Sequence, residues 1–200
     1  DKTNIGSPMP KFTFGWTNTF RYKNFDLSVF INGSYGNKVY NYLSMKLTHM
    51  NSPWTNQLNA VNGRAQLVPI NPNKVYEDGT MWYNDVSNVM VANPGASIPR
   101  ATINDPNDND RISDRYIEDG SYIRLKNISL GYTFPKKTID KLGLSNLRIY
   151  ANIQNLLTIT GYDGYDPEIG ASTSSVNVYG LDNGRYPSPT VYSFGLNVSF

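Results

Sequence analysis

The sequence predicts an all-β protein whose strands form part of a transmembrane antiparallel β-barrel with long extracellular loops. Three observations lead to this interpretation. Five runs of about 10 to 14 residues alternate between apolar and polar side chains, the period-two pattern of β-strands. The apolar set is rich in aromatic rings, while the opposite set consists mainly of Thr, Ser, Asn, Gly, Arg and Gln. Short and long connections alternate between the runs, as in bacterial outer-membrane barrels.

The first two strands are expected at residues 11–22 and 25–36. In both runs the rings and aliphatic side chains occupy every second position, and Phe30 is the one exception. Only Lys23 and Asn24 separate the runs, and Asn is a favoured residue in tight hairpin turns. The two runs therefore predict a β-hairpin.

Three further strands are expected at residues 121–134, 145–158 and 189–200. Pro135 ends the first of them, because proline has no backbone N–H to donate within a sheet. The last run has the cleanest alternation, and its apolar residues are Tyr192, Phe194, Leu196, Val198 and Phe200.

The connections at residues 23–24 and 135–144 are short, whereas those at 37–120 and 159–188 are long and rich in Asn, Asp, Gly, Pro and Tyr. Outer-membrane barrels have short periplasmic turns and long extracellular loops. The order of the connections places both long loops on the same side of the membrane. A tilted strand crosses a bilayer with about 9–11 residues, which matches the length of the runs.

Composition excludes several classes of function. The 18 Lys and Arg residues nearly balance the 16 Asp and Glu residues and are scattered, so no basic face for nucleic acid is expected. The chain has no Cys and a single histidine, His49, which leaves few groups for catalysis. Asp114, Glu118 and Asp119 lie close together but precede a strand on its exposed side, where the pKa of a glycosidase acid would be hard to raise. We therefore expect no enzyme.

A soluble β-sandwich is the alternative, because periodicity does not distinguish a lipid-facing surface from a protein core. Such a protein would be a carbohydrate-binding module that uses Trp54 and Trp82 as a stacking platform. The connection from 37 to 120 is unusually long for a compact sandwich. Arg148 and Gln154 on the polar side of a strand also suit a wet lumen better than a packed interior.

Several segments carry a resemblance to a known family. They are residues 113–137, the segments IYANIQNLL (149–157) and TGYDGYDPEIG (160–170), PMPKFTF (8–14), 22–27 and the closing 192–200. Together they closely resemble the C-terminal part of the SusC/RagA family of TonB-linked outer-membrane transporters, from about residue 5 to 200.

The resemblance implies the last five strands of a 22-stranded barrel, with the plug and the earlier strands upstream of Asp1. It also implies import of oligosaccharides or peptides across the outer membrane of a Gram-negative, Bacteroidota-like bacterium. TonB would act through the missing N-terminal part, and a SusD-like surface lipoprotein would be the partner. The final strand resembles the signal that the barrel-assembly machinery reads, with Tyr192, Phe194, Leu196, Val198 and Phe200 as its residues.

Aromatic residues in the long loops are candidates for substrate contact, because rings stack on the faces of sugars. They are Trp54, Trp82, Tyr83, Tyr162 and Tyr165, together with Tyr179 and Tyr186. The alternative is that these rings pack the loops together or contact the partner.

Asp105, Asn107 and Asn109 place oxygen side chains at alternate positions, as calcium loops do. An EF-hand is excluded, because Asp110 replaces the required Gly and Tyr116 replaces the bidentate Glu. No cofactor is expected; these three residues are candidates for a looser calcium site, and the alternative is a solvated Asx-rich turn. A second acidic group, Asp163, Asp166 and Glu168, is interpreted as a turn because glycines surround it, although a lipoprotein partner or an ion would also fit it.

Overall fold

The computed structural model describes residues 2–169 and 178–200. The chain divides into two compact units, one formed by residues 1–42 and 113–200 and the other by residues 43–112. The first unit holds the large sheet, and the second holds most of the long connection between its strands. In the part of the chain that the structure describes, no helix has the length and apolar character needed to cross a membrane.

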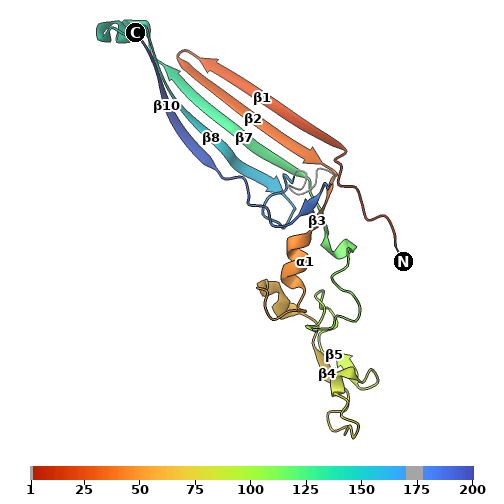
Figure 1. The fold of residues 1–200 in the computed structure, drawn as a ribbon. Coiled ribbons are helices and arrows are strands. Elements are labelled where there is room, and N and C mark those ends of the chain that lie inside the picture. The colour runs from red at the N-terminus through yellow and green to blue at the C-terminus, as the bar shows by residue number, and fades with distance from the viewer. Residues whose placement is uncertain (1, 170–177) are drawn as a thin grey trace. The chain divides into compact units, whose positions relative to one another are not determined.

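The large sheet has five strands in the order β1-β2-β7-β8-β10, and every neighbouring pair is antiparallel (Figure 1). Each strand begins and ends within two residues of the predicted range. The strands are β1 (Phe12–Tyr22), β2 (Phe25–Tyr35), β7 (Tyr122–Thr133), β8 (Asn146–Thr160) and β10 (Val191–Ser199).

One face of this sheet is apolar across all five strands. The register aligns Phe20 with Leu27, Leu27 with Leu130, and Leu130 with Ala151, which in turn faces Phe194. The described residues leave most of these side chains exposed, and Phe194 is 84% accessible. The described residues therefore provide no second layer over this face. A β-sandwich would require such a layer.

A β-bulge interrupts β7 at Lys126 and changes which residues face the apolar side. Along β7, Leu125 pairs with Ile31 before the bulge, and Ile128 pairs with Val29 after it. The extra residue moves the apolar positions of β7 from odd numbers before the bulge to even numbers after it, so Leu125 and Ile128 lie on the same apolar face. On the neighbouring strand β8, Asn155 takes a left-handed φ of 52°, which Asn tolerates better than most residues.

The opposite face is polar and carries an ion pair that bridges three strands. Arg148 on β8 donates to Asp26 on β2, with Nη2 at 2.5 Å from Oδ2 and Nε at 3.2 Å from Oδ1. Gly131 on β7 lies between them, and a Cβ atom at this position would collide with both side chains. The absence of a side chain at Gly131 therefore makes room for the pair.

The two short connections differ in form. In the β1–β2 turn, Lys23 rather than Asn24 takes the left-handed conformation, with φ of 52°. The β7–β8 connection forms the short helix α2 (Lys136–Ile139) and the turn η4 (Asp140–Leu142), which Gly143 ends with φ of 69°. Ile139 is buried there, while the three lysines of the connection are exposed.

The long connections, which the sequence predicts only as loops, contain several short regular elements. In the first unit, β3 (Lys38–Asn41) pairs with β6 (Ile117–Asp119) and with β9 (Leu181–Asp182) in a small mixed sheet, and η3 (Asp114–Tyr116) precedes β6. Residues 170–177 of the predicted loop 159–188 lie outside the described residues.

The second unit is built from short elements joined by side-chain hydrogen bonds. They are α1 (Tyr42–Thr48, with Tyr42 in the first unit), η1 (Asn59–Gly63), β4 (Leu67–Pro69), η2 (Trp82–Asn84) and β5 (Val89–Val91). β4 and β5 pair in antiparallel fashion. The buried Asn88 donates to the carbonyl of Asn71 at 3.1 Å and to the Tyr76 hydroxyl at 2.9 Å, and thereby fixes the connection between the two strands.

Candidate functional site

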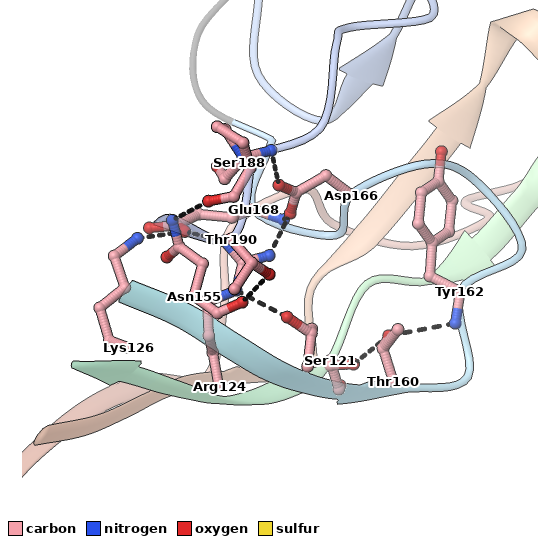
Figure 2. A network of polar contacts seen from close by, with 12 residues as sticks. Ser121, Arg124, Lys126, Asn155, Thr160, Tyr162, Asp166, Glu168, Ser188 and Thr190 are labelled. Atoms are coloured by element: carbon pink, nitrogen blue, oxygen red, sulfur yellow. Dashed lines mark hydrogen bonds and ion pairs between the residues drawn. The ribbon is translucent and has the colours of Figure 1, made fainter. Parts of the chain in front are cut away.

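Charged and aromatic side chains come together at two places in the chain. One is a polar network in the first unit, on the polar side of β7 and β8 (Figure 2). The other is a surface cleft that lies wholly within the second unit.

Arg124 on β7 is the centre of the polar network. It is only 2% accessible, and its guanidinium pairs with the carboxylates of Asp166 and Glu168. The distance from Nη1 to Oε2 of Glu168 is 2.6 Å, and Nε donates to the Thr158 hydroxyl of β8 at 2.9 Å. A buried guanidinium has to be paired and hydrogen-bonded, and here three acceptors satisfy it. The segment from Tyr165 to Glu168 is thereby held against the sheet.

Further contacts reinforce this attachment. Lys126, the bulge residue of β7, donates to Glu168 at 2.7 Å. The N–H of Ser188 donates to the second oxygen of Asp166 at 2.9 Å (Figure 2). Burial would raise the pKa of Asp166, but the N–H groups of Ser188 and Glu168 and the Arg124 guanidinium hold that pKa below its usual value. Asp166 therefore stays ionised at neutral pH.

Tyr162 belongs to the framework of the same loop. It is 5% accessible, and its hydroxyl donates to Asp182 at 2.6 Å. Burial raises the pKa of Tyr162, and the Asp182 carboxylate raises it further. Tyr162 was predicted to contact substrate, but its ring and its hydroxyl are occupied inside the loop. Its position matches the alternative that loop rings pack the loops together.

The acidic group at 163–168 combines a turn with ion pairing. Asp166 and Glu168 face Arg124 and Lys126, while Asp163 is exposed. Sequence reasoning missed both cations. The sequence does contain a signal for this pairing. Arg124 and Lys126 are the only charged residues of their strand, and the acidic segment Asp166-Pro167-Glu168 had no predicted partner.

The cleft of the second unit has a volume of about 750 Å³. It brings together two of the predicted substrate residues, Trp82 and Tyr83, whose rings meet edge to face with centroids 5.7 Å apart. Arg64 and Arg100 also line it, and sequence reasoning did not select either residue. The other lining side chains are neutral, so the cleft is positively charged.

The remaining predicted rings lie outside this cleft. Trp54 is 92% accessible and Tyr165 is 64% accessible, and both are displayed on the surface of their own unit. Tyr179 and Tyr186 are exposed as well. Contact of any of these rings with substrate stays a prediction.

The predicted calcium loop is held together by its own hydrogen bonds. Asp105 accepts from the backbone and side-chain nitrogens of Asn109 at 2.6 and 2.5 Å, and it lies 2.9 Å from Nε2 of His49. Burial would raise the pKa of Asp105, but these hydrogen bonds lower it overall. Asn107 is exposed, and within residues 2–169 and 178–200 no group of three or more His, Asp or Glu side chains is arranged to hold a metal. Calcium binding at Asp105 would have to replace contacts that the loop already makes.

The predicted barrel-assembly residues lie in and next to β10, an edge strand of the large sheet. Tyr192, Phe194, Leu196 and Val198 pair with β8 residues of the apolar face. Phe200 follows the strand and is exposed. The recognition of these residues by an assembly machinery stays a prediction.

Comparison with known proteins confirms the resemblance in the sequence. The TonB-dependent receptor P3 of Formosa agariphila is 36% identical over 205 residues, a match that covers 100% of this chain and 17% of the receptor. The TonB-dependent receptor SusC of Bacteroides thetaiotaomicron is 28% identical over 203 residues, covering 100% of this chain and 16% of SusC. No protein-family model matches the chain.

The fold is also that of a solved structure. The RagAB peptide transporter matches with a TM-score of 0.70 and 20% sequence identity, over 98% of this chain and 18% of that chain. The chain thus spans less than a fifth of the relatives that it matches. It is homologous to the C-terminal region of TonB-dependent receptors of the SusC/RagA family, which are transporters of the outer membrane in Bacteroidota.

Proposed function

We propose that the chain forms part of the wall and the extracellular loops of a 22-stranded barrel that imports oligosaccharides or peptides across the outer membrane. The observation that carries this proposal is the one-sided chemistry of the large sheet. An apolar face continues across all five strands and is exposed, while the opposite face carries Arg148, Asp26 and Arg124 in ion pairs. Lipid on the first side and water on the second satisfy both faces.

The connections and the sheet edges support the same assignment. The short turns at Lys23 and at α2 lie at the opposite end of the strands from the long connections. β1 and β10 are the edges of the sheet, so further strands can continue it on both sides. Closure of a barrel removes such edges.

Energy for import would come from TonB through an N-terminal part of the whole protein. A SusD-like surface lipoprotein is the expected partner on the extracellular side, and the barrel-assembly machinery would recognise the final strand. The RagAB complex, named as a peptide transporter, supports the choice of a two-component importer. The similarity to SusC supports the same class of protein.

Cell fractionation of the whole protein tests the proposal. We expect the protein in the outer membrane, extracted only by detergent, because the apolar face needs a cover of hydrocarbon. A protein that is fully soluble without detergent would contradict the proposal and would favour a soluble carbohydrate-binding module.

A further inference from the structure

The cleft in the second unit has the composition of a binding site for a negatively charged ligand. Twelve residues line it, and they include Arg64 and Arg100 but no Asp or Glu. Both arginines are half-buried. Among the residues that the structure describes, no carboxylate lies within ion-pair distance of either guanidinium.

The backbone brings these two arginines together. Arg64 forms an isolated parallel bridge with Ile98, two residues before Arg100, and the N–H of Ala65 donates to the Ile98 carbonyl at 2.8 Å. Asn93 then fixes this strand-like contact, because its side chain donates to the Arg64 carbonyl at 2.9 Å and accepts from the N–H of Gln66 at 2.8 Å. The fold thus sets the backbone positions of both arginines, and Nη1 of Arg64 donates to the Val61 carbonyl at 3.4 Å.

Two acidic residues directly follow cleft residues in the sequence, and both are engaged elsewhere. Asp105, after Asn104, accepts from both nitrogens of Asn109 and lies 2.9 Å from Nε2 of His49. Asp85 directly follows the cleft residue Asn84, but its Oδ2 accepts from Lys74 at 2.5 Å and from the Tyr76 hydroxyl at 2.8 Å. Its Oδ1 accepts from the N–H and the hydroxyl of Ser87. Asp85 therefore does not neutralise the cleft.

Aromatic and amide groups complete the lining. The Trp82 and Tyr83 rings meet at an interplanar angle of 80°, so their faces point in different directions. Gln66 and Asn84 add neutral donors and acceptors. Guanidinium groups bind carboxylates through paired N–H donors, and ring faces bind the flat faces of sugars and peptide side chains.

We propose that this cleft binds a carboxylate group of the imported oligomer, with Arg64 and Arg100 as its ligands and Trp82 and Tyr83 as a stacking surface. This inference rests on the proposed import function and narrows its substrates to acidic oligomers. The carboxylate comes either from uronic acid residues of an oligosaccharide or from acidic residues of a peptide.

Binding to the whole transporter in detergent tests the proposal with matched probes. The probes are an oligogalacturonate with a maltooligosaccharide of equal length, and an oligoglutamate peptide with an oligoglutamine peptide of equal length. We expect one of the two acidic probes to bind at least about tenfold more tightly than its neutral counterpart. The acidic probe that gains affinity identifies the source of the carboxylate.

Substitutions then assign the effect to the cleft. Arg64→Gln and Arg100→Gln should each weaken binding of the acidic probe about tenfold, and Arg100→Lys should weaken it less, because lysine keeps the charge but loses the paired donors. Trp82→Ala should weaken it as well. Arg111→Gln is the control, because Arg111 is an exposed cation of the same unit outside the cleft.

Two outcomes would overturn the inference. In the first, neither acidic probe binds more tightly than its neutral counterpart. In the second, Arg111→Gln weakens binding as much as the cleft substitutions do. Either outcome leaves the import function standing if the protein fractionates with the outer membrane, whereas a soluble protein would reject the import function itself.

Discussion

At the scale of single residues, Arg124 shows how a buried charge attaches a loop to the sheet. Its guanidinium is compensated by two carboxylates that lie 42 and 44 positions later in the chain. The attachment depends on all partners being present, because removal of one member of a buried ion pair leaves the other charge without compensation. Lys126 contributes less, since its side chain and that of Glu168 are about one third exposed, at 32% and 36%.

Replacement of Arg124 by Met should release the segment at residues 162–169 from the sheet. The cost of leaving Asp166 buried without a cation is about 3–5 kcal/mol, whereas Lys126→Met should cost at most about 1 kcal/mol. Limited proteolysis of the folded whole protein measures the effect, and cleavage in this segment should become faster only in Arg124→Met.

Arg21→Met serves as the matched control for this experiment. Arg21 is an exposed cation on β1 for which no ion pair occurs among the described residues. Cleavage of Arg124→Met at the same rate as the unaltered protein would show that the ion pairs do not hold the segment.

At the scale of elements, glycines on the polar face determine how closely side chains cross from strand to strand. Gly131 leaves space for the Asp26–Arg148 pair, and Gly195 on β10 leaves space for the ring of Tyr150. A residue with a Cβ atom in place of either glycine would displace these side chains. The strands therefore depend on small residues at these positions as well as on their alternating pattern.

Gly131→Ala should destabilise the sheet by about 1–3 kcal/mol, because the added methyl group meets the guanidinium of Arg148 and the carboxylate of Asp26. Gly15→Ala is the control on the same face, where the new Cβ atom meets only the edge of the Phe30 ring at 3.2 Å. The measurement is the urea concentration at which the folded band of the whole protein disappears in semi-native gel electrophoresis. Equal midpoints for the two variants would argue against crowding at Gly131.

At the scale of the whole molecule, the exposed apolar face is the feature that decides the environment of the protein. The buried hydrophobic side chains of the described residues are few, and they lie mainly in the loops and short connections rather than on the large sheet. A sheet with this distribution needs an external apolar cover. In the proposed barrel, membrane lipid supplies that cover, and water fills the side that carries the ion pairs.

A pair of adjacent substitutions on β10 tests this assignment of faces. Leu196→Arg should cost about 2–4 kcal/mol if the residue lies near the middle of the bilayer, because it places a charge in hydrocarbon. Asn197→Arg, on the opposite face, should have a mild effect. The yield of folded protein in the outer membrane is the readout, and an equal loss for both variants would contradict the assigned faces.

The sequence alone determined the strands, their faces and the family, because each of these can be recognised from residues that are close together in the chain. A period of two along each run marks a strand and separates its faces, and the turn at Lys23–Asn24 requires only neighbouring residues. The bulge at Lys126 could not be predicted from these local patterns, because a single extra residue shifts the register without any change in composition. Trp82 and Tyr83 were selected by their chemistry as rings in a loop, but the sequence did not reveal their surroundings.

Only the tertiary structure decided which distant residues meet. It paired Arg124 with Asp166, buried Tyr162 against Asp182, and brought Arg64 and Arg100 into one cleft with Trp82. Apart from Arg124 on β7, these residues lie on the long connections, whose path depends on scattered side-chain hydrogen bonds such as those of Asn88 and Asn93. Such contacts have no period along the chain, because each one depends on where the whole loop has already folded.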